Sequence, residues 1–178
     1  KLPENLKQYQ ILDKFILTPT TKCENDLPID YDYILENKLL TKEDLDYIYD
    51  KCFKLYVSGQ YECDKKGLIM CDTKYEFGKA SDGTIMLIDE IHTIESTRYW
   101  KKGSYKSRIA QGLSPENLDK DIIREYVNKG LDVPEDVLET LLTYYRYVYE
   151  TLSGDLITEV SSYKDLDIKS IIDKYNNI

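Results

Sequence analysis

The sequence lacks the features by which several classes of protein are recognised. It has four cysteines in 178 residues and none in Cys-x-x-Cys spacing, so it favours neither a zinc site nor a disulfide framework. It holds one histidine, His92, and no hydrophobic run approaches the length of a membrane span. No signal peptide opens the chain, so the sequence predicts a cytoplasmic protein with reduced thiols and no membrane partner.

Basic residues are also few. Lys and Arg number 24 against 33 Asp and Glu, which gives a net charge of −9 and a sequence pI near 4.7. Because the basic residues form no long run, a nucleic-acid partner is not expected, although a local phosphate pocket is compatible with this charge. Hydrophobic residues make up 42% of the chain and charged residues 32%, which is typical of one globular domain.

The most informative segment is 67–100, where the pattern predicts a β-hairpin. Asp72, Lys74 and Glu76 alternate along the first strand. Because side chains in a strand repeat every two residues, these three project to one side and the intervening residues to the other. One face of this hairpin is therefore expected to be buried and the other to carry chemistry.

The hairpin turn sets which residues oppose one another. Asp82-Gly83 is a typical two-residue turn, which would place Ser81 opposite Thr84 and Glu76 opposite Asp89. Two opposed carboxylates repel unless a cation lies between them, and magnesium is usually held by one or two carboxylates. The alternative is an ordinary exposed strand whose register differs by one residue, which would separate the two acids.

The same segment resembles the signature of phosphoribosylaminoimidazole-succinocarboxamide synthase, the SAICAR synthetase family. The resemblance rests on GLIMCDTKYEFG at 67–78 and LIDEIHTIESTRYW at 87–100, and it extends to 1–24, 119–124 and 143–154. It implies an α+β fold, a sheet with flanking helices, that forms the C-terminal lobe of an ATP-grasp-related two-lobe enzyme. Residues 1–154 would be this lobe, without its N-terminal nucleotide lobe, and 155–178 a C-terminal extension.

The resemblance also implies an activity and a set of site residues. Enzymes of this family join L-aspartate to carboxyaminoimidazole ribonucleotide with ATP and Mg²⁺, in purine biosynthesis. An Arg guanidinium presents a fork of donors that fits a phosphate group. Carried over by position, the catalytic residues are Asp72 and Lys74, the substrate-binding residues are Lys22, Ser96 and Arg98, and the metal ligands are Glu76 and Asp89.

The chain departs from the family pattern in two places. Ile94-Glu95 stands where the family usually has Pro-Asp, so the loop keeps its charge but loses a fixed φ angle. Nothing in the chain corresponds to the family's N-terminal nucleotide lobe, so a piece of a longer or two-piece enzyme is expected. A noncatalytic descendant that acts as an interaction module, and a small-molecule kinase, are the alternatives.

Two single residues carry separate expectations. His92 is expected to continue the strand beyond Asp89-Glu90, where a structural role and a role as general base are both open. Gly59 lies inside a predicted helix and weakens it by about 1 kcal/mol relative to Ala, so a bend or an early end is expected there.

Periodicity and capping residues predict the remaining elements. Short strands and loops are expected in 1–40, and a buried strand in 68–71. The helices are predicted over 41–65 with a cap at Thr41, from Ser114-Pro115 to Gly130, from 132–134 to Gly154 with an apolar stripe, and over 165–175.

Overall fold

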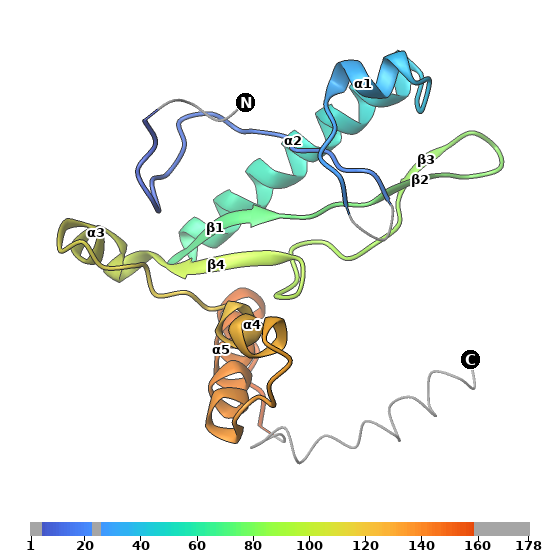
Figure 1. The fold of residues 1–178 in the computed structure, drawn as a ribbon. Helices are drawn as coiled ribbons and strands as arrows, with labels where there is room; N and C mark the ends of the chain where they lie inside the picture. Colours follow the sequence, from blue (N-terminus) through green and yellow to red (C-terminus); the bar gives the residue numbers. More distant parts are fainter. Residues whose placement is uncertain (1–4, 23–25, 159–178) are drawn as a thin grey trace.

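The structure, a computed structural model, describes residues 5–22 and 26–158, and it is a mixed α/β fold (Figure 1). The predicted helix over 165–175 lies outside the described residues. Within the described part of the chain, no helix is both long and apolar enough to cross a membrane. The elements in chain order are α1 (Tyr31–Glu36), α2 (Lys42–Lys65), β1 (Leu68–Thr73), β2 (Phe77–Lys79), β3 (Ile85–Leu87), β4 (Thr97–Lys101), α3 (Lys102–Ala110), α4 (Asp121–Asn128) and α5 (Glu135–Ser153).

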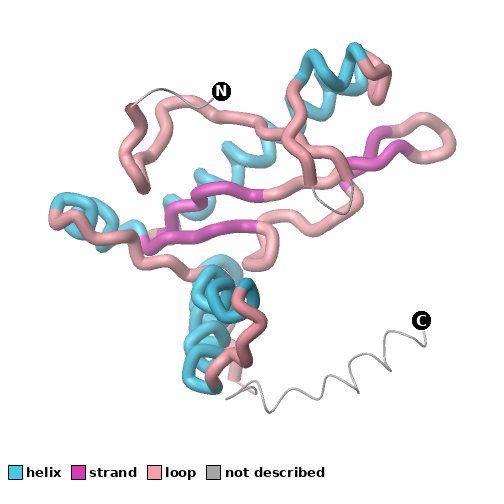
Figure 2. The backbone as a smooth tube through the Cα atoms, in the orientation of Figure 1, coloured by secondary structure: helices cyan, strands magenta, loops and turns pink. Residues whose placement is uncertain are grey.

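The predicted hairpin is present as two successive antiparallel ladders. β1 pairs with β4, and β2 pairs with β3 further out, with irregular backbone between the two ladders (Figure 2). In the first ladder Met70 lies opposite Tyr99 and Asp72 lies opposite Arg98. Cys71 is therefore the extra residue of a β-bulge, which bends the strand immediately before the predicted site residues.

The hairpin turn differs from the predicted one. Ala80, not Ser81, faces Thr84, since the Ala80 N–H donates to the Thr84 carbonyl at 2.9 Å. The Gly83 N–H closes the turn on the Ala80 carbonyl at 2.9 Å, and Gly83 has a φ of 90°. The loop thus has three residues and ends in a left-handed glycine, the usual form of a three-residue hairpin.

This longer loop shifts the register by one residue. Phe77 lies opposite Leu87, and the Ile88 N–H donates to the Glu76 carbonyl at 3.0 Å. The prediction that Glu76 lies directly opposite Asp89 is therefore wrong. Because the ladder ends at Leu87, Asp89 belongs to the loop that follows, and the ladder does not fix the direction of its side chain.

The core lies on one face of the inner ladder, where residues of α2 and α5 pack against β1 and β4. Leu68 and Met70 of β1 are buried, whereas Ile69 and Cys71 are only half-buried, so β1 is covered fully on one face. Figure 1 shows α2 along β1, and α4 and α5 together on the side of β4. The buried cluster consists of Cys63, Leu68, Met70, Tyr99, Leu118 and Val148.

The two long helices follow their local signals. Thr41 caps α2, because its hydroxyl accepts from the Asp44 N–H at 3.1 Å. Gly154 ends α5 in the left-handed conformation with a φ of 85°. The early end considered at Gly59 is absent, since α2 continues through it to Lys65.

The helix predicted to open at Ser114-Pro115 begins later, at Asp121. The intervening backbone instead extends β4 laterally: the Lys101 N–H donates to the Glu116 carbonyl at 3.0 Å, and the Leu118 N–H donates to the Tyr99 carbonyl at 2.9 Å. Pairing with an open strand edge satisfies the same backbone groups that a helix would. The prediction was wrong because this competing partner is distant in sequence.

Candidate functional site

Five of the predicted site residues lie on one face of the inner hairpin. Asp72 is paired with Arg98, and the Lys74 N–H donates to the Ser96 carbonyl at 3.0 Å, which continues the same register. Directly opposed residues of an antiparallel pair project to the same side. Asp72 and Arg98 therefore share one face, and Lys74 and Ser96 follow in the same register just beyond the ladder. Glu76 joins them through its contact with the Lys74 ammonium at 3.0 Å.

Arg98 is held by a two-pronged contact with Asp72. Its Nε and Nη2 donate to the two carboxylate oxygens at 2.9 and 2.6 Å, and this hydrogen bonding raises the pKa of the Arg98 guanidinium. Nη1 lies 3.7 Å from a carboxylate oxygen of Asp121 at the start of α4. The guanidinium is thus oriented by acids on two elements and is still about half exposed.

An N-terminal loop brings further charge to this face. Residues 19–22 and 26–29 lie side by side, with Thr20 bridged to Pro28. Lys22 belongs to the first of these stretches and Asp26 to the second. Both side chains are at least half exposed, so their positions follow the loop backbone rather than packing.

Glu76 is at the centre of the resulting charge cluster. Its carboxylate accepts from the Lys22 ammonium and lies 3.0 Å from the Lys74 ammonium, and its side chain is only 18% exposed. Lys74 lies 3.8 Å from Asp26, and Asp89 also acts on it electrostatically. The cluster therefore joins residues from three separate segments of the chain.

The contacts fix the protonation states of the two central groups. Hydrogen bonding from Lys22, and then from Lys74, lowers the pKa of the Glu76 carboxyl. Hydrogen bonding to Glu76 raises the pKa of the Lys74 ammonium, with Asp26 and Asp89 adding to the effect. At neutral pH Glu76 is a carboxylate and Lys74 an ammonium ion, so the pair is suited to charge stabilisation rather than proton transfer.

The donor set is compatible with a hard divalent cation. Glu76 contacts the Lys74 ammonium group, and Asp89 is one of the charges that raise the pKa of Lys74. Among residues 5–22 and 26–158 no group of three or more His, Cys, Asp or Glu side chains is arranged to hold a metal. Magnesium does not need one, because phosphate and water oxygens usually complete its coordination.

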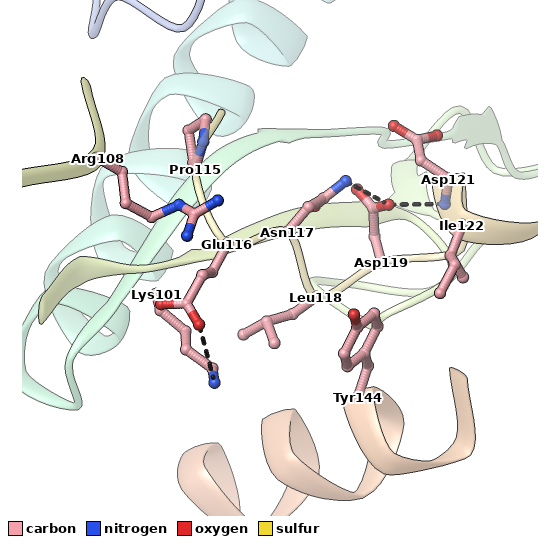
Figure 3. Close-up of a pocket in the computed structure, with 10 residues that line it drawn as sticks. All are labelled: Lys101, Arg108, Pro115, Glu116, Asn117, Leu118, Asp119, Asp121, Ile122 and Tyr144. Carbon is pink, nitrogen blue, oxygen red and sulfur yellow. Dashed lines mark hydrogen bonds and ion pairs between the residues drawn. The ribbon is translucent and has the colours of Figure 1, made fainter. Parts of the chain in front are cut away.

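A cavity of about 420 Å³ adjoins this face through Asp121 (Figure 3). Asp119 lines it and is 2% exposed, and burial raises the pKa of its carboxyl. One oxygen of Asp119 accepts from the Asn117 amide at 3.0 Å and from the Asp121 N–H at 2.7 Å. The cavity is lined by Lys101, Arg108, Pro115, Glu116, Asn117, Leu118, Asp119, Asp121, Ile122 and Tyr144.

Two members of the site were not predicted. Asp26 lies 3.8 Å from Lys74, which is distant from it in sequence, and no local pattern marks it. Asp121 lies in the 119–124 segment quoted for the family resemblance, which could have marked it as a site residue. Its contact with Arg98 depends on where α4 begins.

Comparison with known proteins identifies the class of fold and site. The SAICAR synthetase family model matches residues 1–141. The solved SAICAR synthase from Saccharomyces cerevisiae complexed with SAICAR has a TM-score of 0.67 and 30% identity, and the match covers 89% of this chain and 52% of the yeast chain. A SAICAR synthetase in complex with ADP matches with a TM-score of 0.55 and 28% identity, over 75% of this chain and 47% of the other.

The relatives found by sequence are synthases of the same family. The chloroplastic phosphoribosylaminoimidazole-succinocarboxamide synthase of Vigna aconitifolia is 46% identical over 147 residues, which are 77% of this chain and 43% of the relative. The chain belongs to the SAICAR synthetase family. It spans about half the length of the relatives that it matches.

Proposed function

We propose that this chain is the C-terminal lobe of an ATP-dependent ligase that joins L-aspartate to carboxyaminoimidazole ribonucleotide. The observation that carries the proposal is the common face of Asp72, Lys74, Glu76, Ser96 and Arg98 in a chain of this family. Such a face can bind a phosphorylated, carboxylate-bearing substrate, because it offers fixed cations beside fixed acids. The family match supports the reaction class, and the yeast and ADP-bound relatives are crystallised with SAICAR and ADP.

Substrate binding is assigned to the cations and to Ser96. Arg98, oriented by Asp72, would hold the ribotide phosphate through its remaining N–H groups, with the Ser96 hydroxyl beside it. Lys22 would contact the reactants from the N-terminal loop. Arg98 is already oriented by its neighbours Asp72 and Asp121, so little reorganisation of this side chain would accompany binding.

We assign catalysis to charged side chains that would lie beside the reacting carboxylate of the ribotide. Transfer of the γ-phosphoryl group of ATP to the ribotide carboxylate would give an acyl phosphate and ADP. The aspartate amine would then displace phosphate and form the amide. Lys74, kept as an ammonium ion by Glu76, would stabilise the negative charge that develops on the reacting carboxylate. Asp72 would hold the guanidinium donors of Arg98 in place beside Lys74.

Glu76 and Asp89 would hold Mg²⁺. When bound, the ion supplies positive charge that neutralises the phosphates of ATP. Both ligands are hard carboxylate oxygens, and the lowered pKa of Glu76 keeps it ionised at neutral pH. Because Lys22 and Lys74 each contact one oxygen of Glu76, the ion would take the place of at least one of these ammonium groups.

The nucleotide itself is assigned to a second lobe. We propose that residues 1–154 are the C-terminal lobe of an ATP-grasp-related two-lobe fold, with 155–178 as an extension. The N-terminal lobe, from the same protein or from a separate chain, would correspond to the half of the relatives that this chain does not match. We place the enzyme in the cytoplasm, in purine biosynthesis.

The experiment is Asp89→Asn in the complete protein. The variant should keep the thermal unfolding of the wild type but lose aspartate-dependent ADP release, since only a carboxylate oxygen at a metal site is removed. Asp50→Asn is the matched control, because Asp50 is an exposed acid on α2 that pairs only with Lys54 among the contacts described. Turnover by Asp89→Asn at the wild-type rate would refute the assignment. A wild-type protein that forms no product would favour an interaction module instead.

A further inference from the structure

His92 does not continue a strand, as the sequence suggested, but anchors the loop between β3 and β4. This loop, 88–96, carries Asp89 near one end and Ser96 at the other. His92 has a φ of 54°, the left-handed region that favours glycine and that other residues adopt when their surroundings hold them there. Contacts with the surrounding elements therefore have to hold His92 in this conformation.

Three elements fix His92. Its Nε2 lies 2.5 Å from the Tyr75 hydroxyl, with the two rings 5.6 Å apart. Its backbone carbonyl accepts from the Tyr99 hydroxyl at 2.5 Å, and Tyr99 is fully buried. On the third side the imidazole lies flat against α2 at Gly59, where an added Cβ would come within 2.5 Å of the ring carbon Cε1.

The Gly59 contact explains a residue that is otherwise unfavourable. Glycine inside a helix is destabilising relative to alanine, yet α2 runs through this position without a break. Any side chain at 59 would occupy the space of the His92 ring. The helix and the loop are therefore fitted to each other at one point.

The Tyr75 contact links this anchor to the site. Tyr75 lies between Lys74 and Glu76 in the sequence, and its hydroxyl contacts His92, whereas Lys74 and Glu76 contact each other. The contacts that hold His92 come from Tyr75, Tyr99 and Gly59, none of which is a proposed site residue. It couples the strand that carries Lys74 and Glu76 to the loop that carries Asp89.

We propose that His92, locked between Gly59 and Tyr75, is a positioning residue that sets the placement of Asp89 relative to Glu76. This inference rests on the proposed function, in which those two acids hold the metal. It assigns no proton transfer to the imidazole.

The test uses Mn²⁺ as the probe, titrated into the complete protein in the presence of ADP and followed by electron paramagnetic resonance. His92→Asn removes the ring but keeps a residue that tolerates positive φ, and it should weaken Mn²⁺ binding roughly tenfold, as loss of an outer-shell partner does. Tyr56→Phe is the matched control, because Tyr56 also donates a half-buried hydroxyl, to the Cys71 carbonyl at 2.7 Å, and the hydrogen bonds described for it go to β1 and not to the loop. Its Mn²⁺ affinity should be unchanged.

A second measurement tests the contact without reference to activity. Gly59→Ala should lower the thermal midpoint in the wild-type background and have no such effect in the His92→Asn background, where the ring is gone. Equal effects in both backgrounds would overturn the contact.

The outcomes separate the two proposals. If the wild type binds Mn²⁺ and Asp89→Asn weakens it, but His92→Asn binds as tightly as Tyr56→Phe, the positioning role is overturned and the metal site stands. If Asp89→Asn binds Mn²⁺ as tightly as the wild type, the proposed metal site itself fails.

Discussion

Replacing Arg98 with lysine separates the chemistry of the site from the stability of the fold. The substitution keeps the positive charge but removes the planar fork, which now makes two hydrogen bonds to Asp72, at 2.9 and 2.6 Å. A lysine offers one compact ammonium group and cannot hold Asp72 and a phosphate group in the same fixed geometry. We therefore expect substrate binding to suffer.

The expected result follows from comparing the free energy lost in substrate binding with the free energy lost in folding stability. A hydrogen bond to a charged group contributes roughly 1.5–3 kcal/mol, so losing one to the ribotide phosphate should raise its KM about 10- to 150-fold. The Arg98 and Asp72 side chains are 47% and 55% exposed, and an exposed ion pair stabilises a fold by about 0–1 kcal/mol. The loss of binding should therefore far exceed the loss of stability.

The assay is steady-state ADP release at varied ribotide concentration, with thermal unfolding measured on the same samples. Arg108→Lys is the control, since Arg108 also donates through Nε, to the Ser114 carbonyl at 2.6 Å, and lies on α3, where it lines the neighbouring cavity but bonds to Ser114 rather than to Asp72. An unchanged KM in Arg98→Lys, or a rise matched by Arg108→Lys, would refute the assignment of Arg98 to the phosphate.

Two further predictions concern local stability and pH. Thr41→Ala should lower the free energy of unfolding by about 1 kcal/mol in urea titrations and leave turnover unchanged, because it removes only the cap of α2; a stability equal to the wild type would contradict the cap. The pKa of Glu76 is lowered in the folded state, so its ion pairs contribute stability above the ordinary carboxyl pKa and lose it as pH falls through the lowered value. Carboxyl-carbon NMR titration should show Glu76 ionising below the pH typical of glutamate in the wild type, and closer to that pH in Lys22→Met; no difference between the two would contradict the ion pair.

The elements that could be predicted are those whose signals are local. Helix α2 has its cap and its periodicity within its own residues, and α5 has its stripe and a terminal glycine. Helix α3 has no side-chain cap, and nothing in its sequence predicted it. The helix expected to open at Ser114-Pro115 does not form there, because the backbone groups of this segment pair with β4 instead. That pairing is a tertiary contact, which the local sequence does not reveal.

The register of the hairpin depends on the length of its loop, which the spacing of residues in the sequence does not determine. A two-residue and a three-residue loop are both compatible with Asp82-Gly83, and they differ in whether Ser81 or Ala80 closes the turn. One residue of shift moves the partner of Glu76 from Asp89 to Ile88. The resemblance named both acids without depending on that register, so the predicted residues survive as a proposal although the reasoning from spacing was wrong.

The composition of the charge cluster bears on what it can bind. Around Glu76 the structure gathers Asp26 and Asp89 with Lys22 and Lys74, so acids outnumber bases in a chain that is already strongly acidic. A free polyphosphate approaching such a cluster meets net repulsion, whereas the same polyphosphate carrying a divalent cation does not. Lys22 and Lys74 only partly offset these acids, because each already contacts Glu76. On the proposed function, ATP would therefore approach this cluster as its metal complex, and a failure of the proposed metal ligands would also count against the proposed nucleotide chemistry.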